Sequence, residues 1–345
     1  MYRPRFKGTH YEMGQKFGNI VKKDSTKFPI NLDHFQLDHG VKSGKLLEKH
    51  FPEAFEEIRG IVDVLNINMQ NFVAWMMCMG CCLYNLEVRG CTAFSFVEEE
   101  IIIYGRNNDL PPFLKYISKS ILYKPNTGNS FLLNTSSFIN GEEGINSFGL
   151  VASMTFVLPN MNEIKPGFNS VFLVRYILEK CKNVDEGIQA LYTLPIASSC
   201  NILLIDLSGK MVIVECNPFK VNVREPEENG KKRKFIITVN HFTSDKMKKY
   251  DASSGNGEYY SKERYKTAHE ALMRKDDTNK IKFSQNILDG SFGFMCQYGK
   301  LMNFDTIWST VFDLRSGDVY RTEGNPGKVT YRKDDRFIKH IKTSA

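Results

Sequence analysis

Long apolar runs are missing from this sequence. No stretch approaches the ~18 consecutive apolar residues that a membrane-spanning helix needs, and the opening residues MYRPRFKGTHYEMG lack the apolar segment of a secretory signal. Internal repeats and low-complexity linkers are absent too. With 42% apolar and 25% charged residues, the chain of 345 residues has ordinary globular composition. We expect no membrane span, coiled coil or disorder, and the missing signal favours a cytoplasmic protein.

The sequence also has little excess of one charge. Lys and Arg number 46 against 39 Asp and Glu, a net charge of +7. The longest basic cluster, residues 230–234 (GKKRK), follows three glutamates within residues 225–228, and such a mixed-sign turn is typical of a solvated hairpin tip. A nucleic-acid surface would need a larger basic face interleaved with aromatic residues. We therefore expect no nucleic-acid partner.

Eight cysteines without a signal peptide indicate free thiols in a reducing compartment. Cys78, Cys81 and Cys82 form a CxxCC cluster. A zinc finger would need a second pair at finger-like spacing, and none follows. Because residues 72–79 are apolar on all sides of a helix, we interpret the three as packing thiols and expect no metal.

Helical and strand patterns occupy different parts of the chain. Roughly the first 88 residues predict helices, and the later segments are mainly β-branched and aromatic strands that form hairpins. Ser208–Gly209 and Ser316–Gly317 are typical two-residue hairpin turns. This order predicts an α+β fold of antiparallel sheets with helical layers outside. The expected helices are 10–23, 44–66 with a break near 51–52, 68–86, 168–180, 184–193 and 261–274; the expected strands are 92–97, 100–105, 130–134, 144–146, 150–154, 201–206, 210–215, 234–239, 308–313 and 318–322.

One cysteine stands apart from the others. Cys91 follows Gly90 at the junction between the helical segment and the first strand. Glycine at such a junction permits backbone torsions that other residues avoid. On position alone, a buried structural cysteine remains the commoner interpretation.

Polar residues follow the neighbouring strands. Arg106 and Asp109 end the strand that pairs with the Cys91 strand, so the hairpin should return them towards Cys91. An aspartate can hold an amine, and an arginine can hold a thiolate or carboxylate. Asn240 and His241 follow another apolar strand. The Asn240 amide could donate to an oxyanion, and His241 could form a Cys–His pair.

A final candidate lies at the start of a helix. Ser261 is a suitable N-cap for residues 261–274, and Arg264 falls in the first turn. An arginine there could face an anionic or carbonyl group, although a solvated surface arginine is the default interpretation.

Together these motifs resemble the acyl-coenzyme A:isopenicillin N (6-aminopenicillanic acid) acyltransferase family over nearly the whole chain. This family belongs to the N-terminal nucleophile (Ntn) hydrolases and is distantly related to choloylglycine hydrolases and acid ceramidase. Each motif is weak alone, but their order and spacing are specific. The resemblance rests on GTHYEMG at 8–14 with Gly18, RGCT at 89–92, Arg106 and Asp109 at 15 and 18 residues after Cys91, GINSFGL at 144–150, ECNP at 215–218, NHF at 240–242, and Ser261, Arg264 and Tyr265.

The resemblance implies an αββα sandwich of two antiparallel sheets between helical layers. It further implies a precursor that cuts itself between Gly90 and Cys91. Residues 1–90 would form a helix-rich pro-segment or α subunit and residues 91–345 the β subunit, together one compact body. The new α-amine of Cys91, with a reference pKa of about 7.7–8.0, would act as the general base.

The resemblance also implies roles for individual side chains. Cys91 would attack the linear amide of a small N-acyl substrate and form a thioester, which water or an amine then accepts. No cofactor is expected beyond acyl-coenzyme A as an acyl donor, and a homo-oligomer is compatible with the sequence. The implied supporting residues are Asp109 for the amine, Arg106 and Arg264 for the nucleophile and substrate carbonyl, Asn240 with a backbone N–H near Met154 or Thr155 for the oxyanion, and Asn146 and His241 as further substrate or oxyanion candidates.

Two other functions stay open from the sequence. The chain could be a ligand-binding relative that never processes itself, or a Cys–His hydrolase with His241 as base. The sequence does not identify the acyl half or the amine half of the substrate, because pocket shape decides both.

Overall fold

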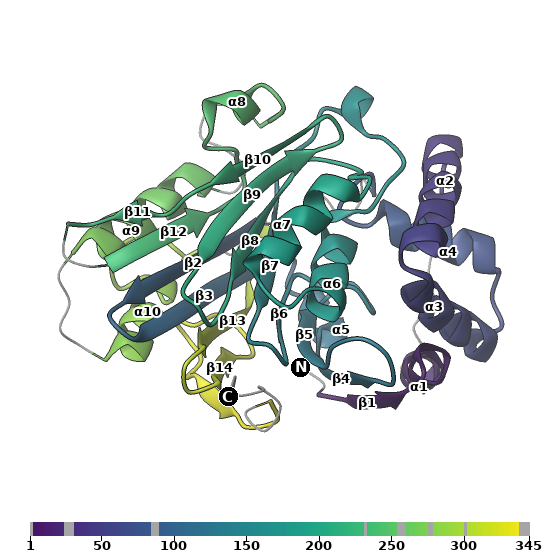
Figure 1. Cartoon of the computed structure of the whole chain (residues 1–345), viewed down its shortest axis with the longest axis horizontal. Coiled ribbons are helices and arrows are strands. Elements are labelled where there is room, and N and C mark those ends of the chain that lie inside the picture. Colours follow the sequence, from purple (N-terminus) through teal and green to yellow (C-terminus); the bar gives the residue numbers. More distant parts are fainter. Residues whose placement is uncertain are drawn as a thin grey trace.

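The computed structural model describes residues 3–23, 31–83, 90–230, 233–253, 260–274, 279–299 and 302–337. Within them the strands form two sheets. The eight-stranded sheet has the order β1-β4-β5-β6-β7-β8-β9-β10, and the seven-stranded sheet has the order β11-β12-β2-β3-β13-β14-β15 (Figure 1). Neighbouring strands are antiparallel except β1 and β4, which are parallel.

The bounds of the strands are as follows. The eight-stranded sheet contains β1 (Arg5–Gly8), β4 (Lys119–Pro125), β5 (Phe131–Thr135), β6 (Glu143–Asn146), β7 (Val151–Phe156), β8 (Cys200–Ile205), β9 (Met211–Asn217) and β10 (Lys220–Arg224). The seven-stranded sheet contains β2 (Gly90–Glu98), β3 (Ile101–Leu110), β11 (Glu227–Glu228), β12 (Arg233–Thr238), β13 (Asp305–Asp313), β14 (Asp318–Thr322) and β15 (Arg332–Asp334).

Helices occupy the outer faces and one end of the molecule. They are α1 (His10–Lys23), α2 (His34–His50), α3 (Pro52–Leu65), α4 (Met69–Cys78), α5 (Leu114–Ile117), α6 (Ser170–Lys180), α7 (Val184–Thr193), α8 (Asp245–Lys248), α9 (Ser261–Met273) and α10 (Lys280–Leu288), with a short 3-10 turn at Met161–Glu163.

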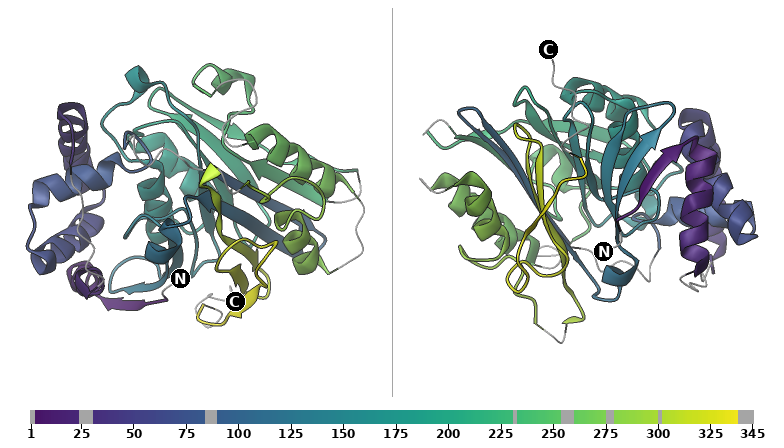
Figure 2. Two further views of the ribbon diagram at one scale, coloured as in Figure 1. Left: turned by 180° about the vertical axis from the view of Figure 1, so that it is seen from behind. Right: turned by 90° about the horizontal axis from the view of Figure 1, so that it is seen from below.

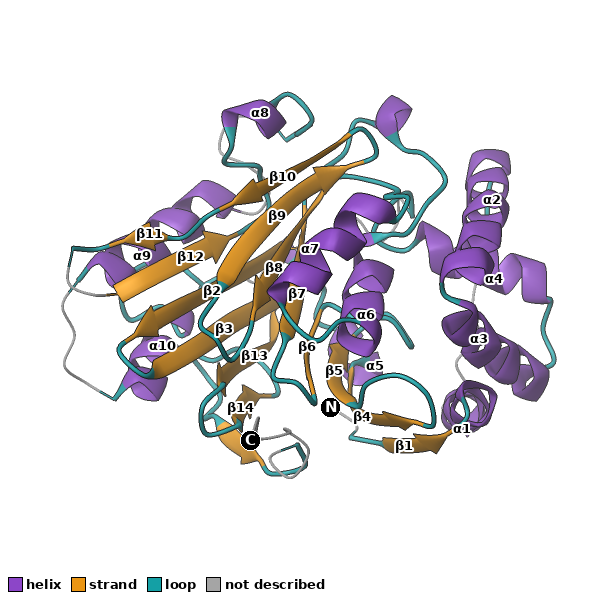
Figure 3. Ribbon diagram, viewed as in Figure 1, coloured by secondary structure: helices purple, strands orange, loops and turns teal. Residues whose placement is uncertain are grey.

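Three apolar layers show that the sheets form a sandwich. Between the sheets pack residues such as Ala93, Ile102 and Ile213. The outer face of the seven-stranded sheet packs under α9 and α10, and the outer face of the eight-stranded sheet packs under α6 and α7. The view from below in Figure 2 and the ribbon in Figure 3 show the helices outside the paired sheets. The expected α+β fold with an αββα sandwich is therefore confirmed.

The N-terminal helices form an additional group beside α6 (Figure 1). Buried ion pairs join this group to the sandwich: Arg175 Nη2 of α6 lies 2.7 Å from Glu57 of α3, and His10 Nε2 of α1 lies 2.7 Å from Glu179 of α6. Tyr123 of β4 donates its hydroxyl to Glu57 at 3.0 Å. In addition, β1 forms the edge strand of the eight-stranded sheet. The described part of the first 80 or so residues therefore packs against the sandwich.

The sequence prediction located most elements and misjudged several ends. The break near 51–52 is present, with Pro52 at the first turn of α3. The helix predicted over 68–86 instead ends at Cys78, because the amides of Cys81 and Cys82 both donate to the Cys78 carbonyl and close a turn. The weakly patterned β1, β4, β10 and α10 were not predicted. The hairpin expected at 230–234 joins β11 to β12, and Lys231 and Lys232 lie outside the described residues.

Glycines at the crossing of α1 and α3 set how closely these helices approach. A Cβ at Gly14 would overlap with the backbone oxygen of Glu57, and a Cβ at Gly60 would overlap with that of Tyr11. Helix backbones this close leave no room for a methyl group. The glycines of the opening motif therefore serve packing.

We expect Gly14→Ala to lower the free energy of unfolding by about 1–3 kcal/mol through overpacking. In an exposed helix, replacing glycine with alanine would stabilise the fold by about 1 kcal/mol. The sign of the change in unfolding free energy therefore distinguishes a close crossing from an exposed helix. Urea unfolding followed by circular dichroism measures the effect. Gly299→Ala is the control, since a Cβ there meets nothing within 4 Å; equal stability of the two variants would contradict the close crossing.

Candidate active site

The pairing of β2 with β3 brings Cys91 next to the polar end of β3. Cys91 is opposite Asn108, Gly90 is opposite Asp109, and Ala93 is opposite Arg106. A Cβ at Gly90 would lie 2.8 Å from Phe304 and 3.2 Å from the Asp109 Cβ. Gly90 is an extended strand residue without positive φ. Contrary to the expectation of unusual torsions, glycine is needed here for space.

The Cys91 thiol points to the face of β2 that meets the other sheet. Arg106 Nη2 donates to Cys91 Sγ at 3.0 Å and to Asn108 Oδ1 at 2.7 Å. The same guanidinium reaches the opposite sheet, where Nη1 donates to Ser153 Oγ at 2.8 Å and to the Met154 carbonyl. Arg106 is thus held by both sheets and directs one nitrogen at the sulfur.

The other face of the same strands carries the second arginine. Arg264 of α9 donates from Nη1 to the Cys91 carbonyl and, at 2.8 Å, to Thr92 Oγ1. The same nitrogen lies 3.8 Å from Asp109 Oδ2. Thr92 faces away from Cys91, as strand alternation predicts. Arg264 is fully buried and is not the solvated surface arginine that its position alone suggested.

Asp109 is held by hydroxyl donors from the C-terminal part of the chain. Thr306 Oγ1 donates to Oδ1 at 2.6 Å, and the Tyr298 hydroxyl donates to Oδ2 at 2.8 Å. Burial raises the pKa of Asp109, while Arg264 and the two hydroxyl donors oppose that rise. The carboxyl group thereby lies next to Gly90 with a fixed orientation.

Asn240 occupies the position opposite Cys91 on the other side of β2. The β2–β12 register, in which Ala93 pairs with Thr238, reaches Asn240 two residues further. Asn240 Oδ1 accepts from the Cys91 backbone N–H and from Arg264 Nη2, each at 2.8 Å, and Nδ2 donates to the Phe156 carbonyl at 2.9 Å. Two donors converge on Oδ1, which defines the orientation of the amide. In this state the amide N–H faces Phe156.

His241 lies beside the site but does not contact the thiol. Its Nδ1 is 2.8 Å from Ser261 Oγ, which also accepts from the Asn240 N–H at 2.9 Å. Burial lowers the pKa of His241 to about 4. Among the described residues, the hydrogen-bond partners of Cys91 Sγ are Arg106 and Asn108.

Three of the predicted substrate or oxyanion candidates have other partners. The Asn146 side chain donates to the carbonyls of Leu178 and Cys181, and its Oδ1 accepts from the turn that follows β6, so it serves local structure away from Cys91. The Met154 N–H donates to the Glu142 carbonyl, which leaves the Met154 carbonyl as its contribution to the site. Thr155 Oγ1 binds Val239 and Thr238 beside Asn240.

The thiol itself sits in a buried and charged environment. Burial raises the pKa of Cys91, and the nearby Arg106 opposes this by favouring the thiolate. Cys91 is 3% exposed. The thiol therefore has little direct exposure to solvent.

Sequence reasoning missed several residues that complete the site. Asn108 shares the face of Cys91, and its Nδ2 is buried without a hydrogen-bond partner in the described part of the chain. Ser153 accepts a hydrogen bond from Arg106. Tyr298 and Thr306 donate to Asp109, and all three residues come from distant segments of the chain. Only Asn108 had a local signal, because it stands between Arg106 and Asp109 on the same strand.

One cavity opens beside Asn240. It has a volume of about 540 Å³ and is lined by His241, Phe242, Thr243, Lys248, Asp251, Ser253, Lys262 and Tyr265. Its lining residue His241 directly follows Asn240, whose side chain accepts from the Cys91 backbone N–H. It is therefore the candidate binding space for part of a substrate.

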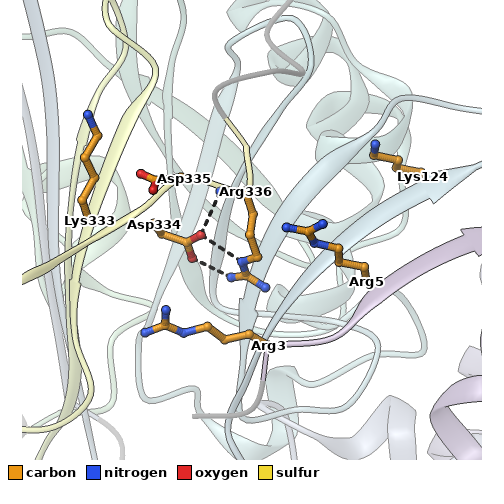
Figure 4. A pocket seen from close by; sticks show the side chains of 7 residues that line it. All are labelled: Arg3, Arg5, Lys124, Lys333, Asp334, Asp335 and Arg336. Atoms are coloured by element: carbon orange, nitrogen blue, oxygen red, sulfur yellow. Dashed lines mark hydrogen bonds and ion pairs between the residues drawn. The ribbon is translucent and has the colours of Figure 1, made fainter.

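A second cavity of about 620 Å³ lies away from Cys91, between β1, β4 and β15. Figure 4 shows its side chains, with Asp334 joined to Arg336 at 2.6 Å. Three of its five basic groups have acidic partners: Arg3 pairs with Glu323 at 2.5 Å, Lys333 with Asp318 at 2.8 Å, and Arg336 with Asp334. It is lined by Arg3, Arg5, Lys124, Lys333, Asp334, Asp335 and Arg336.

A group of side chains able to hold a metal occurs elsewhere in the described structure. His39, Cys81 and Cys82 direct their ligand atoms to within 4.8 Å of one another. This group does not include Cys91. None of the helices in the described ranges is long and apolar enough to cross a membrane. Arg89 of the predicted cleavage motif lies outside the described residues.

The αββα sandwich with a cysteine at the start of a central strand defines an Ntn-hydrolase architecture. Residues 97–328 match the model of the acyl-coenzyme A:6-aminopenicillanic acid acyl-transferase family, about two thirds of the chain. The chain belongs to this family of acyl-transferring enzymes, which confirms the resemblance seen in the sequence. Cys91 lies six residues before the matched segment.

Several solved structures are similar to this chain. Penicillin V acylase from Agrobacterium tumefaciens has 16% identity and a TM-score of 0.43, covering 68% of this chain and 83% of its own. A mutant of conjugated bile acid hydrolase from Clostridium perfringens has 15% identity and a TM-score of 0.48 over 71% and 93%. The Caenorhabditis elegans N-acylethanolamine-hydrolyzing acid amidase ortholog has 17% identity and a TM-score of 0.48 over 73% and 97%. No curated protein sequence matches the chain.

Tyr298 gives a test of how Asp109 is held. We expect Tyr298→Phe to lower the free energy of unfolding by about 1.5–3 kcal/mol, because a hydrogen bond to a buried carboxylate is lost. Urea unfolding measures the change, and Tyr116→Phe is the control because Tyr116 is 88% exposed. Equal stabilities of the two variants would contradict the contact with Asp109.

Proposed function

We propose that this protein is a self-processing Ntn cysteine enzyme that hydrolyses or transfers the acyl group of a small N-acyl amide through a thioester. The observation that carries the proposal is the surroundings of Cys91. Its sulfur is 3.0 Å from a guanidinium nitrogen of Arg106, and its backbone nitrogen is 2.8 Å from Asn240 Oδ1. The nucleophile and the nitrogen that would become its base are thus held by separate partners.

Self-cleavage would begin with the Cys91 thiol. The sulfur attacks the Gly90 carbonyl carbon, an S–C bond forms, and the peptide C–N bond breaks. The thiol proton passes to the leaving nitrogen, which becomes the α-amine of Cys91. Water then hydrolyses the thioester and leaves a carboxylate on Gly90 and a free thiol on Cys91. Asn240, which already accepts from this nitrogen, would continue to hold it as an amine.

After cleavage, residues 1–90 would stay attached as the α subunit. The pairing of β1 with β4 and the buried contacts of Arg175 and Glu179 with α3 and α1 support this arrangement. None of these contacts depends on the peptide bond at Gly90. The two fragments would therefore remain one body.

In turnover the α-amine would take the thiol proton, directly or through water. The thiolate attacks the substrate amide carbon, the amine half leaves with the proton, and the acyl group stays on sulfur. Water as acceptor completes hydrolysis, and an amine as acceptor completes transfer, for which acyl-coenzyme A could supply the acyl group. Asp109 would orient the α-amine, and Arg106 would favour the thiolate.

The oxyanion of the tetrahedral intermediate needs a donor near the sulfur. Asn240 Nδ2 has two hydrogens, and one is donated to the Phe156 carbonyl, so the second could be donated to the oxyanion. Asn108 Nδ2 is a buried donor on the face of the thiol and has no partner in the described residues, so we include it as a second candidate. Loss of one such donor typically costs ~10²–10³ in rate.

The substrate class follows from the family and the cavity. The family takes its name from a transfer to 6-aminopenicillanic acid. The cavity beside Asn240 combines Phe242 and Tyr265 with Lys248, Lys262 and Asp251, and Lys248 is also paired with Asp245 at 2.7 Å. We propose that it accepts a substrate half that carries both an apolar surface and an anionic group.

The two alternatives have less support. The Cys–His hydrolase would need His241 near the thiol, whereas His241 bonds Ser261. The non-processing ligand-binding relative is compatible with the fold, but it gives no reason for two buried arginines to converge on the Cys91 sulfur and carbonyl.

Intact-mass measurement tests self-cleavage. We expect the purified wild-type chain to give two fragments, residues 1–90 and 91–345, with Cys91 as the new N-terminus. Cys91→Ala should give one uncut chain, because the sulfur that attacks the Gly90 carbonyl is removed. Cys181→Ala is the control and should be cut as the wild type is. An uncut, active wild-type protein would exclude this mechanism.

The pH profile distinguishes the two general bases. An α-amine with a pKa of about 7.7–8.0 is protonated at lower pH, so kcat/KM should fall tenfold per pH unit below that value. A base with the pKa of His241, about 4, would leave kcat/KM flat between pH 5 and 8. The measurement uses the best substrate from an N-acyl amide library, with His241→Ala beside the wild type. A flat wild-type profile, together with loss of activity in His241→Ala, would favour the Cys–His mechanism.

A further inference from the structure

A buried group of thiols and one imidazole lies at the end of α4, outside the candidate active site. Cys81 and Cys82 follow the last turn of the helix, and His39 comes from α2. Cys81 Sγ is 3.7 Å from His39 Nε2. Cys82 Sγ lies within 4.8 Å of the ligand atoms of Cys81 and His39. Three possible ligand atoms, those of His39, Cys81 and Cys82, therefore meet in one place. The Cys78 thiol lies beside them and donates to the Gln36 carbonyl at 3.3 Å.

The spacing of these atoms suits a tetrahedral metal. Zinc lies ~2.3 Å from a cysteine sulfur and ~2.0–2.1 Å from a histidine nitrogen, so sulfur and nitrogen ligands of one tetrahedral zinc are roughly 3.6 Å apart. The Cys81–His39 separation of 3.7 Å is close to this value. The ligand atoms of His39, Cys81 and Cys82 all lie within 4.8 Å of one another.

The imidazole is poorly satisfied by the protein alone. His39 is 3% exposed, and the contacts of its Nε2 within the described structure are long, 3.4 Å to Ser43 Oγ and 3.7 Å to Cys81 Sγ. Buried polar groups normally have closer partners. The surroundings include the apolar Ile164 and Ala197 and the hydroxyl groups of Ser43 and Ser198. A metal ion would give this nitrogen a closer partner than either of these.

The backbone holds the ligands in place before any metal arrives. A Cβ at Gly40 would lie 2.5 Å from the Ala74 Cα, so α2 and α4 cross at very short range one residue from His39. Gln36 Nε2, one turn earlier in α2, donates to the Cys82 carbonyl at 2.8 Å. These contacts fix His39 against the turn that carries the thiols.

We propose that His39, Cys81 and Cys82 form a structural zinc site, with Cys78 as the fourth ligand once its thiol releases the Gln36 carbonyl. The site is closed to solvent and has four protein ligands, which is the pattern of structural and not of catalytic zinc. The zinc would join α2 to the turn after α4. Cys82, the last ligand in the chain, lies eight residues before Gly90. This site was not expected from the sequence, because the cluster has no second cysteine pair and His39 lies 42 residues before Cys81.

Metal analysis of the full chain tests the proposal. Apo protein prepared with a chelator is reconstituted with ZnCl₂, desalted, and measured by elemental and native mass spectrometry. We expect about one zinc per chain for the wild type and for Cys181→Ser, a buried cysteine outside the cluster. Cys82→Ser and His39→Ala should lose the bound zinc, and Cys78→Ser should bind it more weakly.

A second measurement does not depend on the variants folding. Wild-type protein reconstituted with Co²⁺ should show the intense visible bands of tetrahedral cobalt together with thiolate-to-cobalt charge transfer, and a chelator should lower its melting temperature. Wild-type protein that takes up no zinc or cobalt, or Cys82→Ser that keeps a full equivalent, would overturn the site. Unchanged affinity in Cys78→Ser would overturn its assignment as fourth ligand. None of these outcomes depends on self-cleavage.

Discussion

The antiparallel register of β2 and β3 is the constraint on which the candidate site depends. It places Cys91 opposite Asn108 and Gly90 opposite Asp109, so that the thiol and the carboxyl group lie on opposite faces of one sheet. A shift of one residue would exchange these faces. Phe304 and the Asp109 Cβ leave space only for glycine at position 90, which helps to hold the register.

Two buried arginines contact Cys91 from the two faces of the seven-stranded sheet. Arg106 lies in the sandwich and connects the thiol to Ser153 of the other sheet. Arg264 lies under the outer helices and connects the Cys91 carbonyl to Asn240 and Asp109. A buried guanidinium is costly unless hydrogen bonds and charges compensate it. Each arginine therefore holds several groups at once before any substrate binds.

The N-terminal helices belong to the same structural unit as the sandwich. Glu57 and Glu179 meet Arg175 in the interior, and β1 extends the eight-stranded sheet. The proposed zinc site would add a further link between α2 and α4. If the chain is cut at Gly90, these contacts explain how the first segment could stay in place and continue to support the fold.

The amount that could be predicted differed between fold and site. β-branched and aromatic enrichment and hairpin turns located the central strands, and the order of motifs identified the family. The sequence also suggested that Arg106 and Asp109 return towards Cys91, because a hairpin brings the end of its second strand back to the start of the first. The direction of the Asn146 amide could not be predicted, since a motif position does not show which way an amide points; in the structure it donates to the Leu178 and Cys181 carbonyls.

The sequence by itself determined the alternation of strands and helices, the position of Cys91 at the start of a strand, and the membership of the family. Only the tertiary structure decided which distant groups complete the site. Tyr298 and Thr306 reach Asp109, and His39 reaches Cys81, across long stretches of chain. Local sequence patterns indicate helices, strands and turns. Contacts between distant residues depend instead on how the sheets and helices pack against one another.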